Sequence, residues 1–254
     1  MKNKLALLLL ALLSLAVSST AQKTTRPVYV IVHGAWGGSW SFKKIDSLLT
    51  QKGATVYRPS LTAQGERVHL ANEQVGLKTH ITDVVNTILY EDLRDVILVG
   101  HSYGGMVITG VADSVPGRIR KLIYLDAFLP EHGETVFDIF GNARNDFKSM
   151  VKGGFIVPPW VVPSTPPPTD VPHPLKTFTD TIQLTNKQRS RISSTYILTV
   201  DKGVDRSKDD FYSQAERARK KGWTVLQLTS DHNPQWSAPL ALAAMLERVR
   251  KQQK

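Results

Sequence analysis

The sequence contains no cysteine in its 254 residues. Disulfide bonds, thiolate metal ligands, a cysteine nucleophile and a lipid-modified N-terminal cysteine are therefore excluded. Long apolar runs are also lacking, since Leu5 to Val17 covers 13 residues whereas a membrane-spanning helix needs about 20. With 41% hydrophobic and 21% charged residues, the composition is not that of a disordered, fibrous or multi-span membrane protein. These exclusions leave a globular domain whose chemistry comes from side chains other than cysteine.

The N-terminal residues have the order of features found in export signals. Lys2 and Lys4 precede the apolar run, and the small residues Ser18 to Ala21 follow it. A charged segment, an apolar core and small residues at a cleavage site are typical of a secretory signal peptide. We therefore expect residues 1–21 to be cleaved after Ala21. The mature chain, residues 22–254, would be periplasmic or secreted, with no stable membrane anchor.

Positive charge exceeds negative charge, with 32 basic and 22 acidic residues and a formal net charge of +10 at pH 7. The basic clusters lie apart in the sequence. The last two are at the C-terminal ends of segments with helical periodicity, where cations interact favourably with the helix dipole. No nucleic-acid-binding motif accompanies the charge, so we expect no nucleic-acid partner. The clusters are at 43–44, 118–121, 217–221 and 248–254.

Short apolar segments alternate along the chain with segments of helical periodicity. The apolar segments predict strands at 28–32, 55–57, 96–99, 122–125, 196–200 and 224–228. The helical spacing predicts helices at 42–49, 81–89, 106–115, 211–220 and 240–249. This alternation predicts an α/β fold with a doubly wound, mostly parallel sheet that binds its ligands at the carboxyl ends of the strands.

A proline-rich stretch interrupts the alternation between about residues 128 and 191. Eight of the 14 prolines lie between Val157 and Pro174, so no regular strand–helix unit is expected there. A linker between two domains has a similar composition. However, the α/β pattern resumes afterwards, and Phe155, Trp160 and Phe178 provide apolar surface to bury. We therefore expect an insertion that folds over the sheet as a cap.

Ser102 is the predicted nucleophile. It is the centre of Gly100-His101-Ser102-Tyr103-Gly104, which directly follows the predicted strand 96–99 and precedes the helix 106–115. Gly-rich turns before helices often serve only packing. In a strand–turn–helix setting, however, the small residues permit a strained backbone that lifts the serine hydroxyl above the sheet. The N-terminus of the helix then provides N–H groups and positive potential for an oxyanion.

A serine hydroxyl needs a base to take its proton. Among seven histidines, His232 is best placed, because it lies between the predicted strand 224–228 and the last helix. We expect His101 to pack beside the nucleophile. The other histidines considered, which we expect to form hydrogen bonds at the surface or in the core, are His69, His80, His132 and His173.

An oxyanion hole requires two backbone donors. The N–H group of Tyr103 follows the nucleophile, and we assign the second donor to Ala35, in the Gly-rich loop 33–38 after the first predicted strand. That loop matches neither the G-x-G-x-x-G motif nor a P-loop, so we expect no nucleotide site.

With these residues the chain resembles α/β-hydrolases of the group that contains plant methylesterases, hydroxynitrile lyases and bacterial pyrethroid-hydrolase-like esterases. The resemblance covers essentially the whole mature chain. It implies an α/β-hydrolase domain over residues 22–254, with a small helical cap over a largely apolar acyl pocket and with no metal or organic cofactor. The matching stretches are 32–36, 65–67, 79–80, 99–106, 124–130, 231–232 and Pro239.

Two positions depart from the lyases of this group. Those lyases carry a threonine directly after the first-strand histidine and a lysine after the catalytic histidine, where this chain has Gly34 and Asn233. Without the lysine, nothing obvious would stabilise a departing cyanide. The resemblance therefore favours hydrolysis over cyanohydrin cleavage.

Three aspartates are candidates for the acid that orients His232. Family members place this acid about 28 residues before the histidine, which falls on Val204 and is flanked by Asp201 and Asp205. Related haloalkane dehalogenases take it from the end of the strand that follows the nucleophile helix, where this chain has Asp126. We favour Asp126, because an aspartate that ends a buried strand needs a partner, with Asp201 as the alternative and Asp205 third.

The predicted function is that of a carboxylesterase with a Ser102-His232-Asp126 triad and an acyl-enzyme intermediate. Its substrate would be a small, apolar or aromatic ester. Trp36, Tyr103 and Phe128 would suit such a pocket, whereas Phe155 and Trp160 fit a pocket wall or an ordinary core equally well. A lyase, or a non-catalytic protein that binds small molecules on the same scaffold, remains the alternative.

Overall fold

The computed structural model describes residues 26–141, 144–162 and 164–252. The predicted signal peptide lies outside these residues. Among the helices in the described ranges, none combines the length and the hydrophobicity that crossing a bilayer requires.

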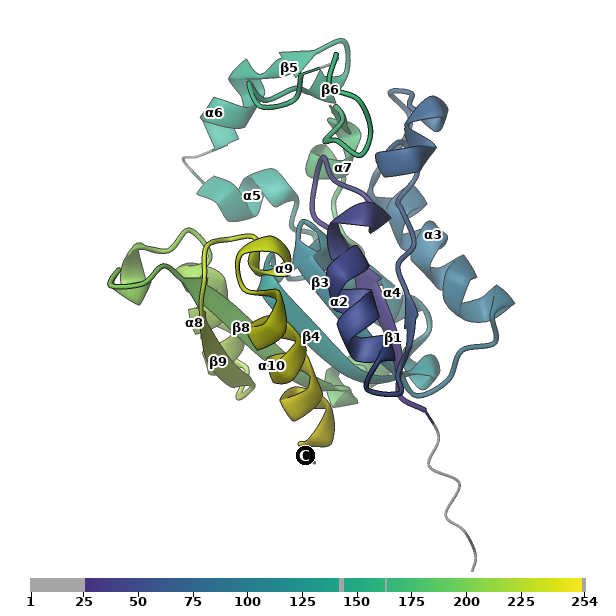
Figure 1. The fold of residues 1–254 in the computed structure, drawn as a ribbon. Coiled ribbons are helices and arrows are strands. Elements are labelled where there is room, and N and C mark those ends of the chain that lie inside the picture. The colour runs from purple at the N-terminus through teal and green to yellow at the C-terminus, as the bar shows by residue number, and fades with distance from the viewer. Residues whose placement is uncertain (1–25, 142–143, 163, 253–254) are drawn as a thin grey trace, which may run out of the picture.

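Six parallel strands form the central sheet, in the order β2-β1-β3-β4-β8-β9 (Figure 1). The chain winds outward from β1 in both directions, so that β1 and β3 are neighbours at the point where the strand order reverses. Ligands of such sheets bind at the carboxyl ends of the strands beside this point. The strands are β1 (Val28–Val32), β2 (Thr55–Tyr57), β3 (Val96–Ser102), β4 (Ile119–Ala127), β8 (Ser193–Val200) and β9 (Thr224–Thr229).

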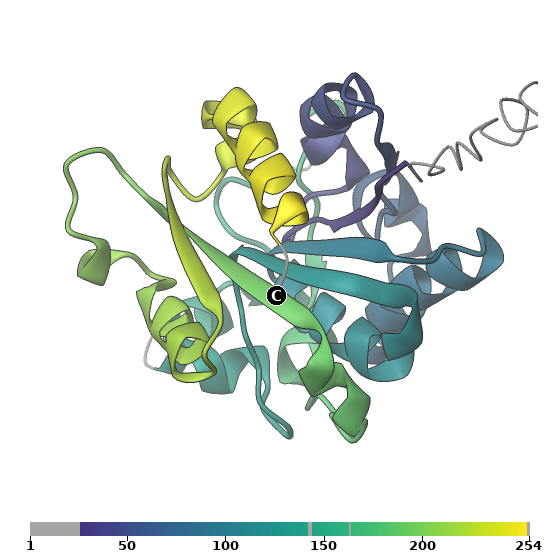
Figure 2. The same ribbon diagram turned by 90° about the horizontal axis from the view of Figure 1, so that it is seen from below.

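Helices cover both faces of the sheet, as Figure 2 shows from below. Because successive side chains of a strand point to opposite faces, Val96 and Leu98 of β3 join one apolar core while Ile97 and Val99 join the other. This explains why the strands are continuously apolar. One core packs against α3 (Leu77–Tyr90), α4 (Gly104–Ser114) and α8 (Tyr212–Lys220), and the other against α2 (Lys43–Thr50) and α10 (Pro239–Lys251).

The predicted doubly wound, mostly parallel sheet is confirmed, and the described part of the sheet is entirely parallel. Four strands, β3, β4, β8 and β9, are longer than their apolar runs indicate. β3 continues through His101 to Ser102, and β4 begins at Ile119, so that the charged Lys121 lies inside the strand and is buried.

The described residues between 136 and 179 lie above the carboxyl ends of the strands (Figure 1), whereas Asn186 bonds Asp113 near the end of α4, at the opposite edge of the sheet. The resemblance implied a helical cap, but this segment combines helices with a three-stranded antiparallel sheet whose strands are two residues long. A turn through Gly153 and Gly154, both with positive φ, joins the first two of these strands. The elements are α5 (Val136–Phe140), α6 (Arg144–Ser149), β5 (Val151–Lys152), β6 (Phe155–Ile156), β7 (His173–Pro174) and α7 (Lys176–Thr179).

The aromatic residues that were expected to provide buried apolar surface in the cap differ in their exposure to solvent. Phe178 of α7 is 1% exposed and belongs to the main core, whereas Trp160 is 55% exposed. The expectation that Trp160 provides buried apolar surface was therefore wrong. Its side chain instead stands edge-on to Trp36, with 5.5 Å between the ring centroids.

Candidate active site

Ser102 is the last residue of β3, and its backbone has φ +54°, a left-handed conformation that is costly for a non-glycine residue. The sharp turn into α4 brings three backbone segments together. A Cβ atom at Gly100 would lie 2.6 Å from the Gly104 carbonyl oxygen, and one at Gly104 would lie 2.6 Å from the Val32 carbonyl oxygen. The two glycines of the motif thus allow the close packing that holds Ser102 at the edge of the sheet.

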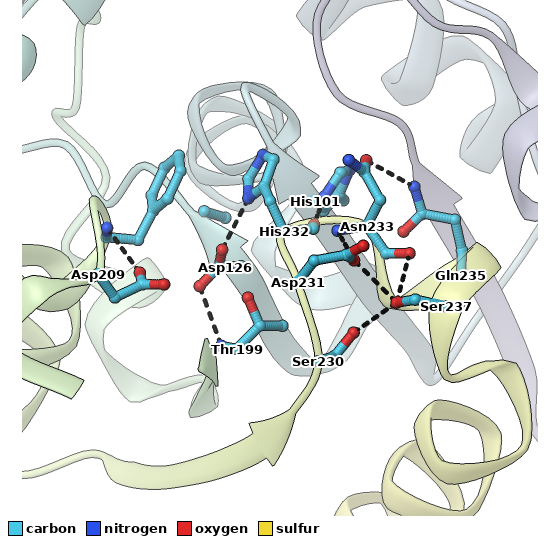
Figure 3. Close-up of polar contacts among 12 residues, drawn as sticks. His101, Asp126, Thr199, Asp209, Ser230, Asp231, His232, Asn233, Gln235 and Ser237 are labelled. Atoms are coloured by element: carbon cyan, nitrogen blue, oxygen red, sulfur yellow. Dashed lines mark hydrogen bonds and ion pairs between the residues drawn. The ribbon is translucent and has the colours of Figure 1, made fainter. Parts of the chain in front are cut away.

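Asp126 and His232 are in direct contact (Figure 3). The Oδ2 atom of Asp126 lies 2.7 Å from Nδ1 of His232, and Oδ1 accepts a hydrogen bond of 3.0 Å from the Thr199 N–H group. Asp126 is 1% exposed and is the next-to-last residue of β4, where its backbone has φ +44°. Because Nδ1–H of His232 donates to a carboxylate, its Nε2 atom is left as the basic nitrogen of the ring.

The other two candidate acids do not contact His232. Asp201 and Asp205 are exposed in the loop after β8. The Asp205 carboxylate accepts hydrogen bonds of 2.9 Å from the N–H and hydroxyl groups of Ser207, which hold its pKa below the usual value. Asp231 caps the following turn through the Asn233 N–H group, at 2.8 Å.

The His232 ring is held from both sides by other rings. Phe211, just before α8, stacks on it with 4.9 Å between centroids and a 4° angle between planes. His101 lies on the other side, at 4.8 Å, and its Nε2 atom is 2.8 Å from the His232 carbonyl oxygen. Burial lowers the pKa of His101 to about 3, so His101 is neutral and donates this hydrogen bond. The position expected for His101, beside Ser102, agrees with its place in β3.

The stacking of Phe211 on His232 was not visible in the sequence, because a phenylalanine at a helix start reads as ordinary core.

Ala35 and Tyr103 both line the cavity that contains Ser102. Neither backbone N–H group donates to another group within the described part of the chain. The loop that carries Ala35 is fixed, because the Trp36 N–H group lies 3.3 Å from His173 Nδ1 and the Trp36 carbonyl accepts a 2.9 Å hydrogen bond from Val171. Two residues that line this cavity with Ser102 therefore keep an uncommitted backbone N–H group.

A layer of neutral histidines lies beneath this loop. Burial lowers the pKa of His33 to about 4 and that of His80 to about 3, and it holds the pKa of His173 well below the usual value. His80 Nε2 is 2.8 Å from the Thr62 carbonyl oxygen, so its Nδ1 atom accepts from the Tyr103 hydroxyl at 3.0 Å. His80 and His173 are core hydrogen-bonding residues, as expected, whereas His69 and His132 are exposed.

Two adjoining cavities meet at Ser102 and His232. The inner cavity, of about 290 Å³, has mainly aromatic walls, and the outer cavity, of about 370 Å³, has polar as well as aromatic walls. Trp160 lines both cavities, whereas Phe155 lines neither. Beyond the shared Ala35, Trp36, Ser102, Trp160 and His232, the inner cavity is lined by Tyr103, Asp126, Phe128, Phe140, Phe147, Phe178, Asp209, Asp210 and Phe211, and the outer one by Gly34, Gly37, Ser41, His101, Asp170, Asn233, Gln235 and Trp236.

Among the described residues, no group of three or more histidine, aspartate or glutamate side chains is arranged to hold a metal ion. The polar groups at the meeting point of the cavities are suited to chemistry by proton transfer and backbone donors. A hydroxyl, an imidazole with a buried carboxylate, and two N–H groups are the components of acyl transfer by serine.

Comparison with known sequences bears on this arrangement. The model of the alpha/beta hydrolase family matches residues 29–245. The chain belongs to this family. Among curated relatives of this alpha/beta hydrolase, a carbendazim hydrolyzing esterase from Nocardioides sp. (strain SG-4G) is 49% identical over 128 residues, which are 50% of this chain and 53% of the relative. An alpha-hydroxynitrile lyase from Arabidopsis thaliana is 33% identical over 104 residues, 41% of this chain and 40% of the lyase. The chain thus spans about half the length of such relatives, or less.

Solved structures share the fold of this alpha/beta hydrolase over most of its length. An extracellular alpha/beta-hydrolase from a Paenibacillus species superposes with a TM-score of 0.76 at 23% identity, covering 89% of this chain and all of that one. A methylesterase from Arabidopsis superposes with a TM-score of 0.68, also at 23% identity, covering 88% and 98% of the two chains. At these identities the likeness establishes the alpha/beta hydrolase fold.

Proposed function

We propose that the protein is a carboxylic ester hydrolase that forms an acyl-enzyme on Ser102. The observation that carries the proposal is the 2.7 Å contact between His232 and the buried Asp126, on the wall of a cavity that also contains Ser102. The relatives named as esterase and methylesterase support the same reaction class.

The proposed reaction has two steps. Nε2 of His232 takes the hydroxyl proton as Ser102 Oγ attacks the ester carbonyl, and the N–H groups of Ala35 and Tyr103 stabilise the negative charge that develops on oxygen. Asp126 holds the ring in the required tautomer and stabilises the imidazolium. The protonated His232 then gives its proton to the departing alcohol. In the second step water, activated in the same way, releases the acid.

The two cavities suit the two halves of an ester. The walls of the inner cavity include Phe128 and Phe178, which are 4% and 1% exposed, so much of this cavity is apolar, with Asp209 and Asp210 also in its lining. The lining of the outer cavity includes Trp160 and Trp236, which are half-exposed. Because the alcohol must leave while the acyl group is still bound to Ser102, we assign the acyl group to the inner cavity and the alcohol to the outer one.

Cyanohydrin cleavage is the weaker candidate. A Cβ atom at Gly34 would lie 3.0 Å from Ser102 Cβ and 3.5 Å from its Oγ atom, so a threonine there would stand against the hydroxyl. Asn233, where lyases of this group carry lysine, lines the outer cavity. Both departures from the lyases therefore lie beside the reacting groups, where they have chemical consequences.

The direct test is turnover of short-chain p-nitrophenyl esters by the wild-type protein, Ser102→Ala and the matched control Ser47→Ala, an exposed serine on α2. Circular dichroism establishes that all three proteins are folded. We expect turnover by the wild type and by Ser47→Ala and its loss, by several orders of magnitude, in Ser102→Ala. Activity in Ser102→Ala would overturn the mechanism. A folded but inactive wild type would favour the lyase, tested by cyanide release, or a binding protein.

We also propose that the protein is exported, on the basis of the charged, apolar and small-residue order of residues 1–21. The mass of the mature protein, purified from a bacterial host that processes signal peptides, tests this. A chain that begins at Gln22 is expected. An intact N-terminus on protein recovered from the cytoplasm would contradict it.

A further inference from the structure

The polar groups of the outer cavity are mostly hydrogen-bond acceptors whose own donors are already engaged. Gln235 of α9 (Pro234–Ser237) is 2% exposed, and its Nε2–H group donates to Asn233 Oδ1 at 3.1 Å. Its Oε1 atom is buried and has no partner within the described chain. A buried, unpaired carbonyl oxygen costs about 1 to 3 kcal/mol, which a donor on a ligand would recover.

Asp170 provides a negative charge at the same cavity. Its carboxylate forms no hydrogen bond or ion pair with the described residues, and partial burial raises its pKa. Among the described residues that line this cavity, none is a lysine or an arginine. The charge of Asp170 is therefore available to a ligand.

Two further acceptors complete the set. The Nε2–H group of neutral His101 donates to the His232 carbonyl, so its Nδ1 atom carries a lone pair, on the side that faces Gly34. The Ser41 hydroxyl donates to the Gly38 carbonyl at 2.8 Å, which leaves its oxygen lone pairs free. The exceptions are the amide nitrogen of Asn233 and the backbone N–H group of Ala35, which add donors to the lining.

Indole rings form the remaining walls. Trp36, Trp160 and Trp236 line the cavity, and Trp236 is fixed by stacking on Trp40 with 5.7 Å between centroids and 16° between planes. The face of an indole attracts a cation, by about 0.5 to 2 kcal/mol depending on its exposure to water. Acceptors, one carboxylate and aromatic faces together suit a positively charged group with an N–H bond.

We propose that the outer cavity binds a protonated amine on the alcohol half of the substrate, so that the preferred substrates are esters of amino alcohols. Asp170 pairs with the ammonium charge, and Gln235 Oε1 accepts a hydrogen bond from its N–H group. This proposal rests on the proposed esterase function and adds the substrate class. Asp170 and Gln235 determine specificity and take no part in the bond-breaking steps.

The test compares two esters of the same aromatic acid that are nearly equal in shape. One carries a 2-(dimethylamino)ethyl group, which is protonated at neutral pH, and the other a 3-methylbutyl group. We expect wild-type kcat/KM to be at least about tenfold higher for the ammonium ester, as for a hydrogen-bonded charge pair that is partly buried. Asp170→Asn should bring the ratio of the two kcat/KM values down about tenfold. Asp205→Asn, a matched change in an exposed loop, should leave the ratio as it is.

The outcomes separate this proposal from the esterase proposal. Turnover of both esters at equal kcat/KM, or a ratio that Asp170→Asn does not lower, would overturn the amine site and leave the esterase intact. If neither ester is hydrolysed, calorimetry can still measure the binding of the two esters to Ser102→Ala. Tighter binding of the ammonium ester, lost when Asp170→Asn is added, supports the amine site. Equal binding of the two esters overturns it. A trimethylammonio ester, which has no N–H bond, should bind more weakly than the dimethylammonio ester. Equal binding would contradict the role of Gln235.

Discussion

Mild acid should destabilise this protein strongly, because it buries several histidines in their neutral form. Burial lowers the pKa of His33 to about 4 and the pKa of both His80 and His101 to about 3, while an unfolded histidine titrates near 6.5. Between these values the unfolded chain binds protons that the folded chain does not bind. The stabilising contribution is therefore complete above about pH 6.5 and is lost as the pH falls.

The magnitude follows from proton linkage. At pH 5.5 an unfolded histidine is about nine-tenths protonated, which favours unfolding by roughly 1.3 kcal/mol relative to pH 7.5. His33, His80 and His101 together give a loss of about 4 kcal/mol, and His173, whose pKa is also lowered, acts in the same direction. Asp209 opposes them, because burial and the charge of Asp126 raise its pKa to about 6, but it is a single, partly exposed group. A loss of this size is a large fraction of the 5 to 15 kcal/mol that stabilises a typical domain.

Urea denaturation at pH 7.5 and pH 5.5, followed by tryptophan fluorescence, measures the loss. His101→Gln should reduce the number of protons taken up on unfolding by about one, and therefore reduce the loss of unfolding free energy between the two pH values by about 1.3 kcal/mol. His69→Gln, at an exposed site, should leave that loss unchanged. A free energy of unfolding that changes by less than about 1 kcal/mol between the two pH values would refute the reasoning. So would an equal pH dependence in both variants.

Three further predictions concern single residues. Asp126→Asn should lower kcat for an activated ester by about 10³ to 10⁴, because the histidine would adopt the wrong tautomer, whereas Asp201→Asn should change kcat by less than about twofold. Steady-state kinetics of both variants checks this prediction. A larger loss of kcat in Asp201→Asn would show that the acid is misassigned. Lys121→Met should lower the free energy of unfolding by about 1 to 3 kcal/mol, because the buried ammonium group donates to two carbonyls at the end of α10, at 3.0 and 2.8 Å. Urea titration measures this loss. An unchanged free energy of unfolding would show that water replaces the two hydrogen bonds. Gly34→Ala should lower kcat/KM by more than about tenfold, because the added Cβ atom would lie 3.0 Å from Ser102 Cβ. Unchanged ester turnover would mean that the loop 33–38 shifts to make room for the methyl group without displacing Ser102.

The sheet could be predicted because its strands are buried on both faces and so leave unbroken apolar runs. The ends of the strands could not, because hydrogen bonding continues where apolarity stops. β3 continues through His101 by backbone pairing with Leu125 of β4, while the His101 side chain bonds a carbonyl 131 residues away. Lys121 is tolerated inside β4 because the end of α10 supplies acceptors for its ammonium group. Such partners are set by the tertiary fold, and no local pattern reveals them.

The residues of the candidate site also divide into those that the local sequence reveals and those that only the tertiary fold brings together. Local context singles out Ser102 and Ala35, since each lies in a Gly-rich turn after a buried strand. The aspartate that contacts His232 could not be derived by counting, because counting leads to Val204, in an exposed loop, whereas the contact depends on the distance between β4 and the loop after β9. The contribution of Asp170 and Gln235 to the outer cavity was missed. Asp170 and Gln235 lie 65 positions apart in sequence, and neither belongs to a motif.

The hydrogen bond from the Thr199 N–H group to Asp126 has a consequence for how the site can evolve. Backbone pairing between β4 and β8 ends at Leu125 and Ile197, and two residues further along β8 the aspartate side chain stands in for the next main-chain carbonyl. The carboxylate therefore closes the seam between two strands while its second oxygen holds the imidazole. A lineage that moved the acid to the loop after β8 would have to supply another acceptor for Thr199, or let the sheet open at its reactive edge. In the proposed mechanism, one side chain therefore serves both the pairing of two strands and the transfer of a proton.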